Sequence, residues 1–109
     1  MKVIAEIDVR PMGVGVSQRE EVVEAVRILV EQGLEVRVNA LGTEVEGQLE
    51  QVFSAVAAIH RVLHESGSER LLTNLRIESR TDHEVDLDEA VSIVERMIEA
   101  GDVSRTTVS

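Results

Sequence analysis

Polar side chains that could hold a small molecule gather in residues 35–47, whose sequence is Glu-Val-Arg-Val-Asn-Ala-Leu-Gly-Thr-Glu-Val-Glu-Gly. This stretch predicts two short strands joined by a turn at Leu41-Gly42. Because side chains alternate along a strand, the valines point to one side of the sheet and the polar residues to the other. An amide, a guanidinium and two carboxylates on that polar side could serve a ligand or a partner subunit. The polar residues are Arg37, Asn39, Glu44 and Glu46.

Two further strands are expected to position this hairpin. Residues 2–10 alternate between apolar and polar side chains, which predicts a half-buried strand, and residues 70–79 alternate in the same way. Pro11 and the glycines that follow it end the first of these strands. The polar segment 80–84 is expected to be a loop.

Three helices are expected between and after the strands. Ser17 and Glu20 have the spacing of a capping box, and Asp86 and Glu89 repeat that pattern. The middle helix has a stripe of apolar residues at helical spacing that includes Phe53. A glycine follows each stripe and is expected to stop the helix. The expected helices span residues 17–33, 48–67 and 86–101.

The order of elements predicts an α+β fold, a ferredoxin-like βαββαβ sandwich with an added C-terminal helix. Two helices should cover one face of a four-stranded antiparallel sheet. Residues 1–101 are expected to form one domain, and residues 102–109 lack a packing pattern and are expected to be disordered. The uncovered face would carry Glu6, Asp8, Arg10, Arg37, Asn39, Glu44, Glu46, Asn74, Arg76 and Glu78.

That polar face admits two interpretations. Antiparallel sheets often leave one face in water, so it can be an ordinary solvated surface. Alternatively, subunits stack these faces, pair their charges and leave a polar cavity between them. Sheets with open edges and one uncovered face are often completed by assembly. We therefore favour an oligomer over a solvated monomer.

Composition and charge narrow the classes of partner. The chain has 109 residues and a formal net charge of −10, with 21 acidic and 11 basic residues, which argues against nucleic acid. The negative electrostatic field of such an acidic chain favours a cationic or neutral polar ligand. No cysteine is present, and no apolar run is long enough to span a membrane. Glu6 and Asp8 interrupt the first apolar run, unlike in a signal peptide, so the expected location is the cytoplasm.

Catalysis and metal binding find little support in the sequence. His60 and His64 lie four residues apart on a predicted helix, a spacing that can chelate a metal, but no carboxylate completes a known motif. No serine or threonine has a base and an orienting carboxylate nearby. We therefore predict no catalytic residue, no metal site, no cofactor and no enzymatic activity.

Several motifs resemble the small thiamine-binding protein family, whose relatives include the YkoF-like proteins. The first is Ala5-Glu6-Ile7 in the first strand, followed by Pro11 and the loop glycines. The most specific is Asn39-Ala40-Leu41-Gly42-Thr43 followed by Glu46-Gly47, and Thr73-Asn74-Leu75-Arg76-Ile77 is similar to the family's last strand. The resemblance covers residues 3–98 in order. One departure is Ala40, where the family usually has proline.

The resemblance implies a ferredoxin-like subunit that assembles into dimers and tetramers through sheet edges and faces. It also implies binding of thiamine or its hydroxymethylpyrimidine part, without known catalysis. The chain lacks Trp and Tyr, so Met12 and Leu41 would have to supply the apolar contacts that an aromatic platform gives elsewhere.

Five residues are candidate ligand contacts on this basis. Asn39 is the first, because a buried amide offers the donors and the acceptor that an aminopyrimidine needs; it could instead stabilise the turn. Thr43 could bind a ring nitrogen or close the turn. Glu46 could accept from an exocyclic amine or form an ion pair with Arg37 or Arg76. The candidate set is Asn39, Thr43, Glu46, Glu6 and Asn74.

Three functions remain open at this point. The first is a non-catalytic small-molecule binding protein, with its site on the polar sheet face near a subunit interface. The second is a structural or regulatory oligomer without a small ligand. The third is an enzyme, which ranks last because no catalytic constellation is visible.

Overall fold

The computed structural model describes residues 1–13, 19–83 and 85–100. The expected cap Ser17, the expected stop Gly101 and the tail 102–109 lie outside the described residues. The elements are β1 (Lys2–Pro11), α1 (Arg19–Glu31), β2 (Glu35–Asn39), β3 (Gly42–Gln48), α2 (Leu49–Glu65), β4 (Leu71–Ser79) and α3 (Leu87–Glu99).

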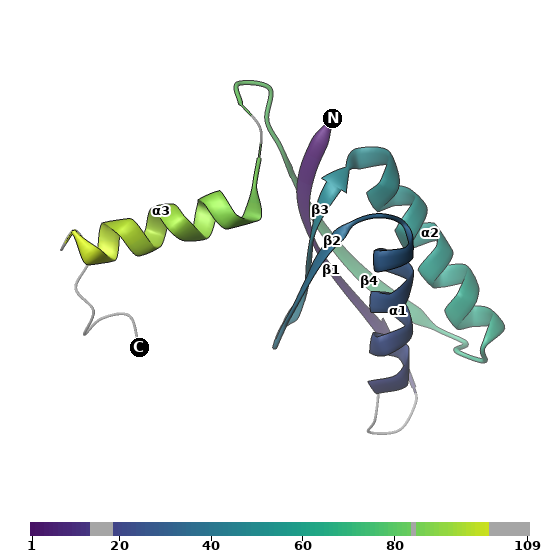
Figure 1. Ribbon diagram of the computed structural model, residues 1–109. Coiled ribbons are helices and arrows are strands. Elements are labelled where there is room, and N and C mark those ends of the chain that lie inside the picture. The colour runs from purple at the N-terminus through teal and green to yellow at the C-terminus, as the bar shows by residue number, and fades with distance from the viewer. Residues whose placement is uncertain (14–18, 84, 101–109) are drawn as a thin grey trace.

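The four strands form one antiparallel sheet in the order β2-β3-β1-β4. Helices α1 and α2 lie side by side on one face of this sheet (Figure 1). This is the ferredoxin-like arrangement that the sequence predicts, with α3 added after the last strand. β2 and β4 are the edge strands, and β1 runs through the centre between β3 and β4.

The core lies between the sheet and the two helices. Val3 and Val45 contribute from the sheet, and Val52, Ile59 and Leu29 contribute from the helices; each is at most 1% exposed. The core is aliphatic because the only aromatic residue, Phe53, points elsewhere and is 54% exposed. Sequence analysis assigned Phe53 to the buried stripe of α2. The buried face instead follows Val52, Ala55, Ala58, Ile59 and Leu63, whose alanines let α2 approach its neighbours closely.

The helix ends follow the predicted signals where they are described. Gln48 caps α2, and its backbone N–H donates to Gln51 Oε1 at 2.7 Å. Gly33 and Gly67 follow α1 and α2 with φ angles of +86° and +111°, a region that favours glycine. Asp86 caps α3 by accepting a hydrogen bond from the backbone N–H of Glu89 at 3.0 Å.

The hairpin turn lies one residue earlier than expected. Asn39 pairs directly with Gly42, so the two turn residues are Ala40 and Leu41, and Gly42 belongs to β3. Leu41 is 86% exposed at the tip. A Cβ at position 42 would lie 3.5 Å from Glu6 Cγ of the neighbouring strand, which is an ordinary packing distance, so neither the turn nor the packing requires glycine there.

Helix α3 projects from the side of the sheet opposite α1 and α2. Its first residue, Leu87, is 8% exposed, whereas Val91, Val94 and Met97 are between 44% and 55% exposed. The helix therefore touches the sheet at its root and then projects away from the body as an arm (Figure 1).

Candidate functional site

The open face of the sheet, meaning the face away from α1 and α2, carries a row of four charges across the four strands. The strand register places Arg37 of β2 beside Glu44 of β3, Glu44 beside Glu6 of β1, and Glu6 beside Arg76 of β4. The order of charges across the sheet is therefore plus, minus, minus, plus. Two carboxylates directly opposite each other are unfavourable in an isolated sheet.

The charges of this row are only partly neutralised within one chain. Arg37 forms an ion pair with Asp88 of α3. Among the described residues, Glu6, Glu44 and Arg76 form no ion pair. Glu6 and Arg76 are exposed. The central part of the row is thus available to a ligand or to another subunit.

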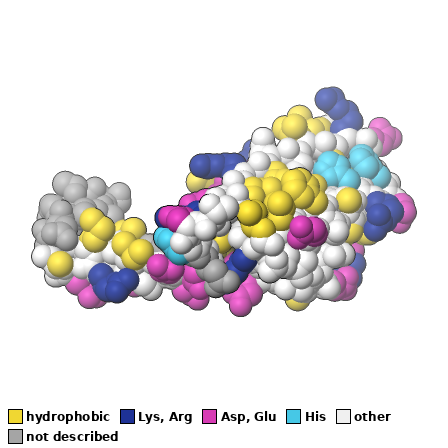
Figure 2. Space-filling view, turned by 90° about the horizontal axis from the view of Figure 1, so that it is seen from above, with side chains coloured by type: hydrophobic (Ala, Val, Ile, Leu, Met, Phe, Trp, Pro, Cys, Tyr) yellow, Lys and Arg dark blue, Asp and Glu magenta, His cyan; other side chains and the backbone are white. Residues whose placement is uncertain are grey.

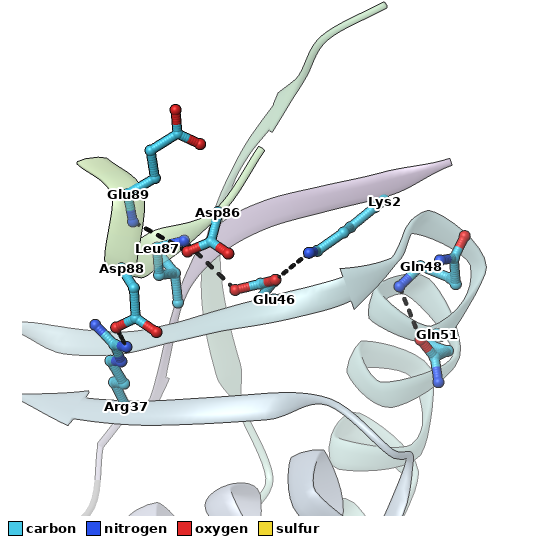
Figure 3. Close-up of polar contacts among 9 residues, drawn as sticks. All are labelled: Lys2, Arg37, Glu46, Gln48, Gln51, Asp86, Leu87, Asp88 and Glu89. Carbon is cyan, nitrogen blue, oxygen red and sulfur yellow. Dashed lines mark hydrogen bonds and ion pairs between the residues drawn. The ribbon is translucent and has the colours of Figure 1, made fainter. Parts of the chain in front are cut away.

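Glu46 lies on the same face but is committed to partners within the chain (Figure 3). Its carboxylate is 8% exposed and forms an ion pair with Lys2 Nζ at 2.5 Å. Its other oxygen accepts a hydrogen bond of 3.4 Å from the backbone N–H of Leu87, the first residue of α3. A carboxylate at a helix N-terminus is favourable because the first N–H groups have no partner within the helix. Glu46 therefore holds the first turn of α3 against the sheet. Of the two roles expected for Glu46, the structure shows the ion pair, but the partner is Lys2 and not Arg37 or Arg76.

Thr43 points to the helix side of β3, because it lies two residues before the buried Val45. It is 8% exposed and pairs with Ile7 of β1 and Val38 of β2. Thr43 lines a cavity of about 260 Å³ between the hairpin tip, β1 and α1. This cavity is called the hairpin cavity below. It is lined by Ile7, Asp8, Val9, Arg10, Val22, Ala25, Leu29, Val38, Asn39, Ala40, Leu41, Gly42 and Thr43.

Asn39 also lines the hairpin cavity and is exposed at the end of β2. The sequence-based argument assumed a buried amide, and in a single copy of the chain the amide is accessible to solvent. Asp8 lines the same cavity, and its carboxylate accepts a hydrogen bond from Arg10 Nε at 2.9 Å. A mostly apolar cavity with a few polar groups is typical of small-molecule sites.

The remaining candidates lie elsewhere. Glu6 lines a second cavity of about 260 Å³ on the open face, together with Glu44, Arg76 and Leu87. Asn74 is exposed on β4, beside Asp8 in the strand register. Asn39 and Thr43 thus both line the hairpin cavity, whereas Glu6, Glu46 and Asn74 do not. The strand register directs Asn39 to the open face, as it does Glu6 and Glu46, and directs Thr43 to the helix side.

Sequence reasoning missed the roles of Lys2 and of the first turn of α3. Neither residue type nor spacing indicates that Leu87 donates to Glu46, because the contact joins segments 41 residues apart. The side of Thr43 was readable, since its parity is that of Val45. Asp8 was assigned to the open face and also reaches the hairpin cavity, because that cavity lies at the end of the sheet.

Two groups of exposed charges away from the row form local ion pairs. At the end of β4, Arg80 donates to Asp82, and this hydrogen bond lowers the pKa of the Asp82 carboxyl to about 2. On α1, Arg27 binds Glu24 and Glu31 and lowers the pKa of Glu24. These pairs lie away from the hairpin cavity and contribute nothing to its chemistry.

The two helix histidines have partners that account for them. His60 Nε2 lies 2.6 Å from Thr73 Oγ1, and His64 Nδ1 lies 2.7 Å from the carbonyl oxygen of Ser68. Within residues 1–13, 19–83 and 85–100, no group of three His, Cys, Asp or Glu side chains is placed to hold a metal ion.

Comparison with known proteins places these features in context. A family model described as thiamine-binding protein matches residues 5–95. UPF0045 protein sll0230 of Synechocystis is 39% identical over 99 residues, covering 91% of this chain and 82% of that protein. UPF0045 protein MJ1052 of Methanocaldococcus jannaschii is 32% identical over 83 residues, covering 76% of this chain and 82% of that protein.

Solved structures share the same fold. The crystal structure of MJ1052 superposes with a TM-score of 0.80 at 29% identity and covers 86% of this chain and 96% of its own. A candidate thiamine biosynthesis/salvage protein of Thermotoga maritima superposes with a TM-score of 0.75 at 24% identity, covering 86% of this chain and 99% of its own. No helix in the described part of this chain has the length and apolar character that a membrane span requires.

Proposed function

This chain belongs to the thiamine-binding protein family, and we propose that it binds thiamine or the hydroxymethylpyrimidine part of thiamine without catalysing a reaction. The family supports a small-molecule binding role. The observation that carries the proposal is the hairpin cavity, a largely apolar space that both Asn39 and Thr43 line.

The polar groups of the cavity suit an aminopyrimidine. The Asn39 amide offers two donors and an acceptor, and the Thr43 hydroxyl can both donate and accept. A substituted pyrimidine presents ring nitrogens that accept and an exocyclic amine that donates. The two side chains together therefore match both kinds of group on the ligand.

The apolar lining supplies contact with the faces of the ring. Ile7, Val9 and Leu29 line the cavity floor and Leu41 stands at its rim. No aromatic side chain lines the cavity, so the ring is held by aliphatic contact instead of stacking. Because stacking is missing, we expect modest affinity.

The size and charge of the cavity favour one half of thiamine over the other. Its volume of about 260 Å³ is just below the range of ~300–1,000 Å³ that is typical of sites for drug-sized molecules. We therefore propose that the pyrimidine ring enters and that the cationic thiazolium stays at the mouth. Asp8 and its ion partner Arg10 both line the cavity, so the preference for a cation comes from the chain's net charge of −10.

The other candidate residues take a different part in the proposal. Glu6, Glu46 and Asn74 lie outside the hairpin cavity, on the open face. We assign Glu6 and Asn74 to the subunit interface of a homodimer or homotetramer, near which the ligand binds, and Glu46 to the support of α3 within one chain. The alternative function, a structural or regulatory oligomer without a ligand, is favoured by the unpaired charges of the open face.

Thermal unfolding with added ligand tests the proposal. Thiamine or hydroxymethylpyrimidine at about 100 times its dissociation constant should stabilise the native state by about 2.7 kcal/mol, because only the folded chain binds it. Asn39→Ala and Thr43→Val should each reduce this stabilisation strongly. Asn74→Ala removes the same amide outside the cavity and should leave the stabilisation unchanged.

Two outcomes would contradict the proposal. No change in melting temperature at millimolar concentrations of either ligand would favour the ligand-free oligomer. Equal loss of ligand stabilisation in Asn39→Ala and Asn74→Ala would move the site from the hairpin cavity to the open face.

A further inference from the structure

The turn between β4 and α3 forms a hollow of about 460 Å³ with the start of β1. The strand register explains why these two segments meet. Val3 pairs with Ser79, so Lys2 and Arg80 are the next residues along the two antiparallel strands. Figure 2, seen from above, shows basic, acidic and histidine side chains gathered where α3 meets the body. This space, called the basic hollow below, is lined by Met1, Lys2, Arg80, Thr81 and His83.

The side chains around the basic hollow differ from those of the chain as a whole. The chain carries a net charge of −10, and Lys2 is its only lysine. Around this one space, however, Lys2 and Arg80 lie together with His83 and the hydroxyl-bearing Thr81. No acidic residue in the described part of the chain lines it. Basic groups that gather in one hollow of an acidic chain indicate a local preference for an anion.

Two ion pairs hold the cationic side chains in place at the hollow. Lys2 Nζ lies 2.5 Å from Glu46 Oε1 (Figure 3), and Arg80 Nε donates to Asp82 Oδ1 at 2.8 Å. Neither Glu46 nor Asp82 lines the hollow, so each pair presents its positive end to that space. Because both long side chains are already ordered by these pairs, binding an anion costs them less conformational freedom.

The lining groups offer hydrogen-bond donors of several kinds. Arg80 uses Nε and Nη2 for Asp82, and nothing in the described part of the chain accepts from its Nη1. His83 makes no hydrogen bond to a described residue, and its Nδ1 lies 3.7 Å from Asp82 Oδ2. The Thr81 hydroxyl can donate as well. A phosphate is tetrahedral and accepts from several directions, whereas a carboxylate accepts mainly in one plane, so donors on both walls suit a phosphate better.

We propose that the basic hollow binds the phosphate group of a small phosphorylated molecule. Arg80 Nη1, Thr81 and His83 donate to the phosphate oxygens, and Lys2 contributes its positive charge. A bare phosphate fills only a small part of about 460 Å³, so the rest of the molecule has room. No residue lines both this hollow and the hairpin cavity. The inference therefore goes beyond the proposed function and does not depend on it.

The histidines make NMR titration a direct test with an internal reference. The chain has three histidines, and of these only His83 lines the basic hollow. Inorganic phosphate, added at constant pH and ionic strength, should shift the ring signals of His83 in a saturable manner. The signals of His60 and His64 should stay in place, because both lie on α2 with partners of their own. Glycerol phosphate should bind at least as tightly as inorganic phosphate, because the hollow has room for the ester group.

Variants of the turn test which groups hold the phosphate. Arg80→Gln removes a charge and a forked donor and should weaken phosphate binding at least about 10-fold. Thr81→Val leaves both ion pairs in place and should weaken binding by about 3-fold or more, through loss of one donor. Arg96→Gln removes an arginine of α3 that does not line the hollow and should keep the wild-type affinity.

Several outcomes would overturn the inference. No shift of His83 at millimolar phosphate, or equal shifts of all three histidines, would mean that the hollow is not a site. Malonate binding as tightly as phosphate would contradict the choice of a phosphate group, and binding of inorganic phosphate without glycerol phosphate would contradict a phosphorylated molecule. Equal losses in Arg80→Gln and Arg96→Gln would reduce the effect to net charge. Thiamine stabilisation of the same samples reports on the hairpin cavity alone, so failure of the proposed function is seen separately.

Discussion

The two faces of the sheet differ in composition and in how far they are covered. The face under α1 and α2 is aliphatic and closed, and its largest side chains are almost fully buried within a single chain. The opposite face carries a row of four charges, of which only Arg37 finds an ion partner within the described residues. Its one helix, α3, meets it at the root and leaves its apolar face exposed.

This difference indicates where each part of the structure gets its stability. The closed face is satisfied by residues of the same chain, so it specifies the fold of a single copy. The open face combines charges that have no ion partner among the described residues with a helix whose apolar side is exposed. An exposed apolar surface of this kind is typical of a contact with another molecule. Stability should therefore reside on the closed face, and function and assembly should reside on the hairpin cavity and the open face.

The largest expected effect comes from matched leucines on the two sides. Leu29 of α1 is 1% exposed in the core, and Leu72 of β4 is 49% exposed on the open face. Leu29→Ala should lower the free energy of unfolding by about 2–5 kcal/mol, because it leaves a cavity among packed side chains. Leu72→Ala should change the stability of the monomer by less than about 0.5 kcal/mol.

Urea denaturation at several protein concentrations provides the measurement. Varying the concentration separates the stability of the monomer from any contribution of assembly. Similar losses for both leucines at the lowest concentration would mean that the open face also holds a single copy together, and the comparison of the two faces would fail.

Two glycines of β3 sharpen the comparison within one strand. Gly47 faces the helices, and a Cβ there would lie 2.5 Å from Leu34 Cδ2 and 3.0 Å from Gln51 Oε1. Gly42 faces the open side, and its Cβ would lie 3.5 Å from the nearest atom, Glu6 Cγ. Gly47→Ala should lower stability by about 1–3 kcal/mol through overpacking.

The same change at Gly42 should be neutral or slightly stabilising, because alanine restricts the unfolded chain and meets ordinary contacts in the fold. Thermal unfolding of the two variants and the wild type under one condition decides the matter. A Gly42→Ala loss as large as that of Gly47→Ala would show that close packing limits both faces equally.

Much of the closed face could be predicted from the sequence. Alternating apolar residues located all four strands, and Gly33, Gly67 and Asp86 marked helix ends as expected. These signals are local: each strand or helix end is determined by residues next to it in the sequence, so the sequence alone is enough to predict it. The turn was misplaced by one residue because the pairing of Asn39 with Gly42 depends on the strand register, and Phe53 was misassigned because it borders the buried stripe of α2 without belonging to it.

The candidate site was harder to predict, because its residues depend on contacts between distant segments. The cavity that Asn39 and Thr43 both line forms only where the hairpin tip approaches β1 and α1. Glu46 binds the first turn of α3 and is not available to the proposed ligand. The alternation of residues along the strands does not predict where α3 contacts the open face. Thr43 was grouped with the candidates of the polar face, although its parity along β3, the same as that of Val45, places it on the helix side.

The smallest expected effect concerns the exposed ion pair at the end of β4. Arg80 donates to Asp82, and both side chains are largely in water. Arg80→Gln should raise the pKa of Asp82 from about 2 toward its ordinary value of about 3.9, as followed by NMR titration of the carboxyl carbon. Arg96→Gln, which changes an arginine of α3 that does not contact Asp82, should leave this titration in place.

The sign of the accompanying pH dependence follows from the lowered pKa. Because the folded chain holds the charged carboxylate more favourably than the unfolded chain does, any stabilisation by the pair is present above about pH 4 and is lost as the pH falls toward 2. Water screens an exposed pair, so the denaturation midpoint of Arg80→Gln at neutral pH should equal that of the wild type. A clear drop in that midpoint would mean that charges beside the open face stabilise a single copy, which is the property that the comparison assigns to the closed face.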